Sequence, residues 1–329
     1  MLFFLKIIRK ILKSLGKKEE KIKKLIILEN FKKIKKNYHI DISNKYLEKK
    51  LNKNLKIVAT IAFFYNKKKL INLNKVCQSL YNIDKSISIH ILTNKISLKE
   101  YNNLKKIIKI KVKIIVIKNT LNERLLPWYH YEIMRKSFKN KNITHFLYLE
   151  DDILINKENF KYWLNCRQLL KKLNLIPGFV RVEKYKKNKN LYTVDYLKKF
   201  KLNSLAQIST NSSIKFVNNP HPYQGMYLYD RELMREHLNG PSSNPDCGHG
   251  AYNLNFINQN MINHDLVAKA NMGLTYINVP DGFLNRIVIP FKIKHNHIDE
   301  VCFIRHLSNK YVKKKSWFGN IKAIEALSN

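Results

Sequence analysis

The sequence predicts an α/β protein in which helices cover both faces of a mostly parallel, doubly wound sheet. The main observation is that, from Leu55 onward, apolar runs of strand length alternate with amphipathic segments of helical length, as in βαβ units. In addition, 45% of the 329 residues are hydrophobic, which is enough for a sizeable core. Finally, one apolar run, residues 145–149, ends abruptly in three carboxylates, as expected at the ligand-binding edge of an open α/β sheet.

The first half of the chain shows the alternation most clearly. Its predicted elements are, in order, strand 56–64, helix 67–81, strand 86–92, helix 98–108, strand 112–117, a helix from Pro127 to about residue 140, strand 145–149 and helix 157–174. Pro127 suits the first turn of its helix, because an N–H group at that position would have no partner within the helix. Strands joined through helices favour right-handed crossovers and parallel pairing.

The second half is less regular. The elements predicted there are strand 178–182, strand 223–229, helix 231–238, helix 256–271 and strand 273–280. Asp230 is interpreted as the N-cap of helix 231–238, because its side chain can accept a hydrogen bond from the first turn. Residues 184–220 are mixed and polar with little pattern, and residues 239–253 are rich in Gly, Pro, Ser and Asn, which indicates a loop.

The chain is strongly basic, with a formal net charge of +38. Only nine of the 62 basic residues are arginine, and the chain is also rich in Asn and Ile. This combination is typical of A/T-rich coding, so part of the charge reflects codon usage, and the lysines are spread over most predicted surfaces. We therefore expect no dedicated nucleic-acid partner. The charge still favours anionic partners such as phosphorylated substrates and membrane headgroups.

The cysteines and the N-terminus bear on localisation. The four cysteines are far apart and form no CxxC pair, which argues against a zinc ribbon and favours free thiols in a reducing cytosol. No run of about 18 apolar residues could span a membrane, and no signal-peptide pattern is present. Residues 1–16 place apolar side chains on one helical face and basic ones largely opposite, which favours adsorption to an anionic membrane; packing on the protein's own domain is the alternative. Residues 17–54 are interpreted as helix and linker. The prediction is a cytoplasmic protein, peripheral on the cytoplasmic face of the membrane.

The three carboxylates after the central strand are Glu150, Asp151 and Asp152. Carboxylates are costly at the end of a buried strand unless a cation or hydrogen bonds compensate them. A pair of carboxylates two residues apart suits a hard divalent cation that also carries phosphate oxygens. The alternative interpretation is an ordinary solvated acidic turn.

Taken in order, these features resemble glycosyltransferases of the GT-A fold. The resemblance covers residues 55–310 and rests on the α/β first half and on three motifs: the DxD-like Glu150-Asp151-Asp152, the glycine-bearing segment YQGMYLYD at 223–230, and Asn263-His264-Asp265-Leu266 preceding VAKANMGLTYINVP. It implies a doubly wound mixed sheet, with a Rossmann-like nucleotide half at 55–156 and an acceptor half at 157–310. Residues 1–54 would precede this domain, and a basic tail, 311–329, would follow it.

The resemblance also implies an activity. It is the metal-dependent transfer of a sugar from a nucleotide donor, a UDP-sugar first of all, to a glycan or lipid-linked acceptor, with Mn²⁺ or Mg²⁺ as the cofactor. By the family pattern Asp152 is the first metal ligand, while Glu150 reaches the metal through water or holds the donor ribose. Asp151 would point toward the donor sugar. His306 is the preferred late histidine ligand and His297 the second choice; a nitrogen ligand favours manganese.

The remaining candidate residues concern the base and the donor. Asp265 aligns best with the family's catalytic acid, but His264 stands where the family usually has Glu. Asp246 and Glu183 are the rivals, and a retaining mechanism would need no base.

For the donor, Phe64 and Tyr65 could stack on the nucleobase and Asn94 could hydrogen-bond it. Arg135 could pair with the pyrophosphate, since arginine suits bidentate phosphate contacts.

Three alternatives remain open. A metal-dependent nuclease or nucleotidyltransferase would use the same acidic triplet. A basic nucleic-acid-binding protein would use the charge, with binding that weakens steeply as salt rises. A non-catalytic peripheral membrane protein would use residues 1–16 alone.

Overall fold

The computed structural model describes most of the predicted domain. The described residues are 37–40, 55–118, 122–185, 190–244, 265–313 and 319–328. The predicted amphipathic helix 1–16, the candidate base Asp246 and most of the predicted helix 256–271 lie outside them.

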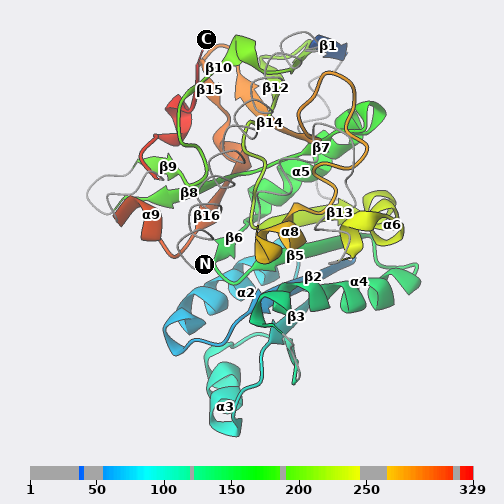
Figure 1. Cartoon of the computed structure of the whole chain (residues 1–329), viewed down its shortest axis with the longest axis vertical. Coiled ribbons are helices and arrows are strands. Elements are labelled where there is room, and N and C mark those ends of the chain that lie inside the picture. The colour runs from blue at the N-terminus through cyan, green and yellow to red at the C-terminus, as the bar shows by residue number, and fades with distance from the viewer. Residues whose placement is uncertain are drawn as a thin grey trace, which may run out of the picture.

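A mixed sheet with the order β13-β5-β2-β3-β4 forms the centre of the first half (Figure 1). Its strands are β2 (Ile57–Phe63), β3 (Ser88–Thr93), β4 (Lys113–Val116), β5 (His145–Glu150) and β13 (Met226–Asp230). The strands β5, β2, β3 and β4 are parallel, and β13 pairs antiparallel with β5. All seven residues of β2 are buried, as expected for a central strand of a sheet covered on both faces. The predicted α/β class and doubly wound mixed sheet are confirmed.

The helices described in this domain are α2 (Leu70–Ile83), α3 (Leu98–Ile107), α4 (His130–Lys139), α5 (Lys157–Leu170) and α6 (Arg231–Asn239), with 3₁₀ turns at Lys67–Lys69, Glu123–Tyr129 and Lys171–Leu173. Three of these five helices, α3, α5 and α6, begin after side chains that cap them. Ser97 and Glu100 form a capping box on α3, which satisfies two backbone N–H groups reciprocally. Asp230 accepts from Leu233 N and so caps α6 as predicted. Pro127 lies in the 3₁₀ turn that leads into α4.

Smaller sheets build the second half of the molecule. One contains β1 (Asn37–Ile40), β11 (Gln207–Thr210), β12 (Ile214–Asn218), β14 (Ile287–Lys292), β15 (His297–Ile298) and β7 (Ile176–Pro177); another has the order β6 (Ile153–Leu154), β16 (Phe303–His306), β8 (Val180–Lys184) and β9 (Leu191–Thr193); β10 (Phe200–Lys201) pairs with β17 (Leu327–Ser328). Short helical segments are α8 (Leu266–Met272), α9 (Lys310–Lys313) and 3₁₀ turns at Leu202–Ser204, Pro241–Ser243, Glu300–Cys302 and Ala323–Glu325.

Two expectations for this half were wrong. Residues 184–220 are not irregular, because they contain β9 to β12; the strand β12 pairs with β14, about 75 residues further on, so no local pattern reveals the pairing. The predicted strand 273–280 forms turns. Gly273 has φ +47°, and a Cβ there would lie 2.2 Å from the Tyr229 hydroxyl. This glycine ends α8 in close contact with β13, and the apolar residues after it are buried without forming a strand.

The triplet lies where the chain passes from one sheet to another. Strand β5 ends at Glu150, and β6 begins at Ile153. In β6, Ile153 pairs with His306 of β16, and β16 in turn runs parallel to β8. This connection brings side chains of β8 and β16 to the carboxyl end of the central strand. Among the described residues, no helix is long and apolar enough to cross a membrane.

Candidate functional site

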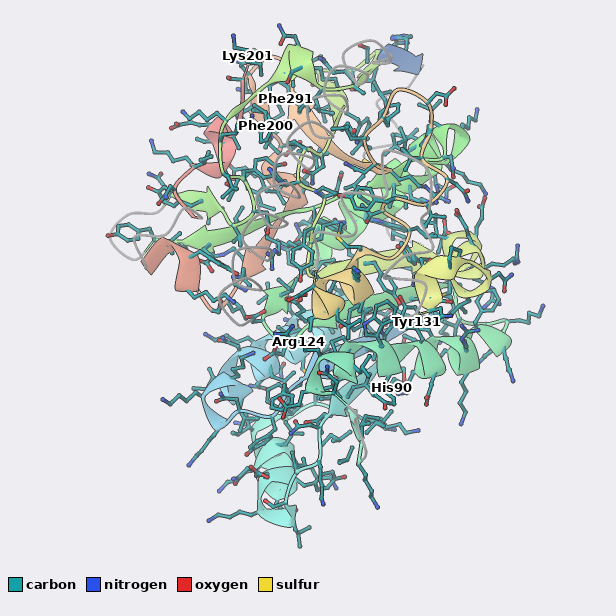
Figure 2. The ribbon with its side chains drawn as sticks, in the orientation of Figure 1. His90, Arg124, Tyr131, Phe200, Lys201 and Phe291 are labelled. Carbon is teal, nitrogen blue, oxygen red and sulfur yellow. The ribbon has the colours of Figure 1, made fainter. Side chains whose placement is uncertain are left out.

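A cleft of about 1000 Å³ opens at the carboxyl ends of β2 and β5. Its walls come from distant parts of the chain and include Phe64, Lys69, Arg124, the triplet 150–152, Arg181, Asp195, residues 220–223, Asp265, Tyr276, Asn285, His306, Lys310 and Tyr311. Arg124 lies between the end of the molecule that carries α3 and the end built from the smaller sheets (Figure 2). The cleft therefore occupies the position predicted for the triplet, at the carboxyl edge of the sheet.

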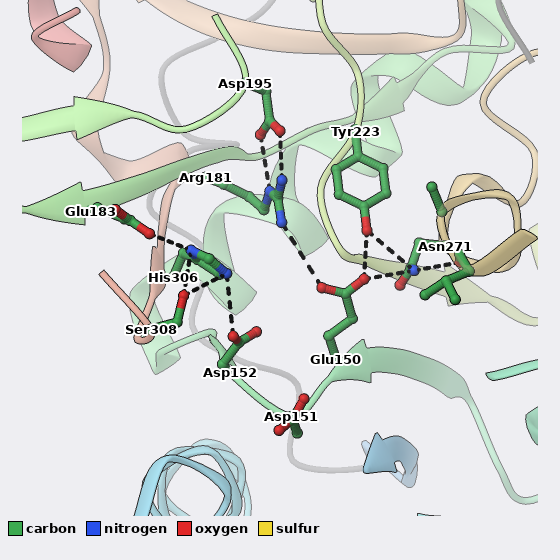
Figure 3. Close-up of polar contacts among 12 residues, drawn as sticks. Glu150, Asp151, Asp152, Arg181, Glu183, Asp195, Tyr223, Asn271, His306 and Ser308 are labelled. Atoms are coloured by element: carbon green, nitrogen blue, oxygen red, sulfur yellow. Dashed lines mark hydrogen bonds and ion pairs between the residues drawn. The ribbon is translucent and has the colours of Figure 1, made fainter. Parts of the chain in front are cut away.

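Glu150 is held at the floor of this cleft by neutral donors and one distant cation (Figure 3). Its Oε1 accepts hydrogen bonds from the Tyr223 hydroxyl at 2.5 Å and from Asn271 Nδ2 at 3.0 Å. Its Oε2 is 3.9 Å from Arg181 Nη1. Burial raises the pKa of Glu150, although the Arg181 charge opposes this shift. Glu150 thus turns toward β8 and β13, whereas Asp152 faces His306.

Arg181 is the buried cation of the site. Its guanidinium makes a bidentate contact with Asp195, with distances of 2.9 Å from Nε and 2.5 Å from Nη2, and stacks on the Tyr223 ring at 4.4 Å from the centroid. Burial opposes its charge, but Asp195 outweighs burial and raises the pKa of Arg181. A permanent positive charge is therefore fixed beside Glu150.

Asp151 points away from the other two carboxylates and toward α2. Lys69 Nζ lies 3.3 Å from each of its oxygens. Burial and the neighbouring Asp152 raise the pKa of Asp151 to about 7, even though Lys69 lowers it. Asp151 and Asp152 form the turn between β5 and β6, so the chain changes direction there and the two side chains face different partners.

Asp152 and His306 lie side by side, with Oδ2 and Nε2 3.3 Å apart. The other ring nitrogen, Nδ1, is 2.6 Å from Glu183 Oε1. Burial opposes charge on Asp152, but the contact with His306 outweighs it and lowers the pKa of Asp152. Burial likewise disfavours the imidazolium, but the hydrogen bonds to Asp152 and Glu183 raise the pKa of His306. The two carboxylates and the ring form one chain of contacts (Figure 3).

The pair fits a divalent metal with few protein ligands. Adjacent ligands of an octahedral ion at about 2.1 Å lie about 3 Å apart, close to the 3.3 Å between Asp152 Oδ2 and His306 Nε2. In the described part of the chain, no group of three or more His, Cys, Asp or Glu side chains could hold a metal. A metal here would complete its shell with water and phosphate oxygens, as Mg²⁺ and similar hard ions usually do.

The other predicted residues divide between the cleft and its surroundings. Asp265 lines the cleft, where its Oδ1 caps α8 by accepting from Ala268 N at 2.7 Å. Phe64 lines it too and is 39% exposed, unusually open for a large apolar side chain. Tyr65 is not among the lining residues; its backbone N–H donates to Asn94 Oδ1 at 2.8 Å. That bond uses the acceptor oxygen through which Asn94 was expected to contact a base.

Three predicted residues lie away from the cleft lining. Arg135 donates from Nη2 to Ser243 Oγ at 3.1 Å, on the side of α4 that meets the turn after α6. His297 lies in β15, where Nδ1 contacts Ile298 O. Glu183 is fully buried behind His306 and both of its oxygens are engaged, so it is not placed to take a proton from an acceptor. Strand pairing decides the positions of His297 and Glu183, and the packing of α4 decides that of Arg135; sequence position reveals neither.

The structure adds four residues that the sequence reasoning missed: Lys69, Arg181, Asp195 and Tyr223. Arg181 had a usable signal, since it is one of only nine arginines among 62 basic residues and lies in a predicted strand. Tyr223 lies within the motif YQGMYLYD, but the resemblance rested on the glycine of that motif and gave Tyr223 no role. Asp195 and Lys69 had no signal that distinguishes them from surface residues.

No protein-family model matches the chain, and no curated protein matches it in sequence. Among solved structures, it is similar to the galactosyltransferase LgtC in complex with donor and acceptor sugar analogs, at 14% identity and TM-score 0.23, over 33% of this chain and 42% of that one. The chain thus spans less than half of the LgtC structure.

Two further structures cover more of this chain. The mannosyltransferase PcManGT from Pyrobaculum calidifontis, in complex with GDP-Man and Mn²⁺, is 6% identical with TM-score 0.33, over 62% of this chain and 57% of that one. The 4-diphosphocytidyl-2C-methyl-D-erythritol synthase from Anaerococcus prevotii is 12% identical with TM-score 0.29, over 60% and 79%. At these scores none of the three assigns a residue or a reaction to this chain. Two of these three structural neighbours are glycosyltransferases, the class that the motifs resemble.

Proposed function

We propose that this protein is a metal-assisted glycosyltransferase, which moves a sugar from a nucleotide-diphosphate donor to a glycan or lipid-linked acceptor. A UDP-sugar is the first donor to test. The observation that supports the proposal best is the pairing of Asp152 with His306, 3.3 Å apart, on the wall of a cleft at the carboxyl end of the central strand. Carboxylate and imidazole together suit Mn²⁺ or Mg²⁺, with manganese favoured by the nitrogen.

A bound divalent cation would act as a Lewis acid and neutralise the charge that develops on the leaving diphosphate. The chain's own residues would do the rest. Asp152 and His306 would hold the cation from one side. Lys69, Arg124 and Lys310 line the same cleft and would attract the phosphates as additional positive charges.

Other residues that line the cleft would make the remaining donor contacts and supply the base. Phe64, exposed at the end of β2, would stack on the nucleobase, since an aromatic face left open in a cleft is available for this contact. Asp265 would take the acceptor proton as general base, because it is a carboxylate on the cleft wall. Asp246 lies outside the described residues and stays a candidate for the base. Glu150 would orient the donor sugar or ribose from the floor.

The proposal places the protein in the cytoplasm, held to the cytoplasmic face of the membrane by residues 1–16. Their basic and apolar faces would adsorb to anionic lipid. Such an attachment would keep the cleft near a lipid-linked acceptor.

Binding of nucleotide sugars tests the proposal directly. Thermal unfolding of the full chain with a panel of nucleotide sugars, with and without Mn²⁺, should show stabilisation by one donor that depends on the metal, because ligands that bind only the folded state raise its stability. Asp152→Asn and His306→Ala should lose this metal-dependent stabilisation. Asp84→Asn, which removes a carboxylate outside the cleft, should keep it. Stabilisation by oligonucleotides or nucleoside triphosphates in place of nucleotide sugars would instead favour the nuclease or nucleotidyltransferase alternative.

A further inference from the structure

Glu183 is a fully buried carboxylate that accepts hydrogen bonds from three donors. It is the fourth residue of β8 and has no exposed surface. Its Oε1 accepts from His306 Nδ1 at 2.6 Å, and its Oε2 accepts from the backbone N–H groups of Tyr311 and Val312, both at 2.9 Å. A buried carboxylate is stabilised only when its oxygens are satisfied in this way. Replacing it therefore affects two elements at once.

The first element is the ring of His306. An ionised carboxylate only accepts hydrogen bonds, so Nδ1 must carry the hydrogen that Glu183 receives. The other nitrogen, Nε2, then faces the cleft, 3.3 Å from Asp152 Oδ2. It donates to this carboxylate when the ring is protonated, and it offers its lone pair to a metal when Nε2 is deprotonated. Glu183 thus sets both the orientation of the ring and the nitrogen that faces the cleft, as carboxylates behind metal-binding histidines generally do.

The second element is the segment that carries Lys310 and Tyr311. Both residues line the cleft, and the Tyr311 ring lies 5.6 Å from the His306 ring. Because Glu183 accepts from two successive backbone N–H groups here, it fixes this wall of the cleft relative to the histidine. One carboxylate therefore joins β8, β16 and α9; Figure 3 draws its contact with His306.

We propose that Glu183 is a positioning residue for the metal site: it holds His306 with Nε2 toward Asp152 and anchors residues 310–312 as the adjacent wall. This inference rests on the proposed function. It gives Glu183 a different role from that of a general base, because its oxygens face away from the cleft.

Manganese binding by the full chain, measured by titration calorimetry without nucleotide, tests this role. Glu183→Gln keeps the shape of the side chain but cannot accept from both partners as a carboxylate does. We expect its Kd for Mn²⁺ to rise about 10–100-fold, the usual effect of losing such a contact. Asp152→Asn should reduce binding further. Glu236→Gln is the matched control, because Glu236 pairs with buried Arg286 at 2.7 Å, away from the cleft, and should leave the Kd unchanged.

Hydrogen exchange provides a second readout that distinguishes the outcomes. The amides of Tyr311 and Val312 should exchange faster in Glu183→Gln. Faster exchange with unchanged Mn²⁺ affinity would overturn the positioning role, since Glu183 would then only anchor α9. If Glu183→Gln keeps its Mn²⁺ affinity and Asp152→Asn loses it, the positioning role of Glu183 is also overturned, but the proposed metal site is supported. No binding by the wild-type chain would overturn both proposals. If Glu183→Gln does not fold, Glu183→Asp, which retracts the same charge, replaces it with the same expectations.

Discussion

Buried guanidinium groups in this protein each face a carboxylate. Among the described residues, Arg167 pairs with Asp230, Arg181 with Asp195 and Arg286 with Glu236, and all three arginines are buried. Arginine suits these positions because its planar group makes several hydrogen bonds and is less strongly hydrated than an ammonium. In a chain with nine arginines among 62 basic residues, these buried arginines therefore each mark a buried ion pair.

Removing the Arg181 side-chain charge should destabilise the protein strongly. Arg181→Met leaves Asp195 and Glu150 without their cation, and breaking a buried pair typically costs about 3 kcal/mol or more. Chemical denaturation should show this loss, and adding Asp195→Asn should recover part of it. Arg235→Met, at an exposed position, should change stability by less than about 0.5 kcal/mol. An equally small effect of Arg181→Met would contradict this account of the pair.

Two histidines that are folded in the neutral form should each reduce stability as the pH drops below about 6.5. Burial lowers the pKa of His130 to about 3 and that of His145 to about 4. For His130 the neutral form is also satisfied, since Nδ1 contacts Pro127 O and Nε2 contacts the Tyr227 hydroxyl. The unfolded chain binds protons from about pH 6.5 downward, whereas the folded chain does not until its lower pKa. Each residue thus removes about 1.4 kcal/mol per pH unit within that window.

Chemical denaturation of the wild type and of His130→Gln between pH 7.5 and pH 5 tests whether stability changes in the expected direction and whether His130 causes the change. Per pH unit, the unfolding free energy of the variant should fall by about 1.4 kcal/mol less than that of the wild type, which corresponds to one proton. Identical slopes in the two proteins would show that His130 is not the group responsible.

At the scale of an element, Asp265 is both the N-cap of α8 and a residue of the cleft wall. Its Oδ1 caps the helix by accepting from Ala268 N, and the same residue lines the cleft. A cap and a base make different demands, because Asn can cap a helix but cannot take a proton.

The two roles can be separated by a pair of substitutions. Asp265→Asn should keep stability, whereas Asp265→Ala should lose about 1 kcal/mol as the cap is removed. If Asp265 is the base, both variants should lose transfer activity by about 10²–10⁴-fold. Asp299→Asn, which changes a capping residue outside the cleft, should keep activity. Wild-type activity in Asp265→Asn would leave Asp265 with the capping role alone and return attention to Asp246.

For the whole molecule, charge is distributed less evenly than the lysine-rich composition suggested. Residues 55–118 contain 14 lysines but only two acidic residues, Asp84 and Glu100. All of these lysines except Lys69 are exposed. This segment includes α2 and α3, which lie together at one end of the molecule (Figure 1). Codon usage can add lysines everywhere, but here they also have few acidic residues near them in the sequence.

Membrane attachment should therefore have an electrostatic part and an apolar part. Deleting residues 1–16 should remove cosedimentation with anionic vesicles at high salt, because the apolar face of that segment is lost. At low salt, binding should persist in part, since the basic end of the domain remains and exposed charges act over longer distances there. With neutral vesicles, lowering the salt concentration should not increase the binding of either the full chain or the shortened chain. Equal binding of the full and shortened chains at every salt concentration would contradict the role of residues 1–16.

Local patterns were sufficient for the α/β class, the central strands, the Asp230 cap and the position of the acidic triplet at a strand end, because apolar periodicity and capping are encoded within a few neighbouring residues. The partners of the triplet were not accessible in this way. His306 had been selected through the resemblance, but Arg181 and Tyr223 reach Glu150, and Asp195 reaches Arg181, only through pairings such as β16 with β8 and β13 with β5. Contacts between residues 30 to 150 positions apart depend on which edges and faces meet in the folded chain. That choice belongs to the packing of the whole domain, and it decides which carboxylate faces the cleft, which is buried behind it and which lies beside a cation.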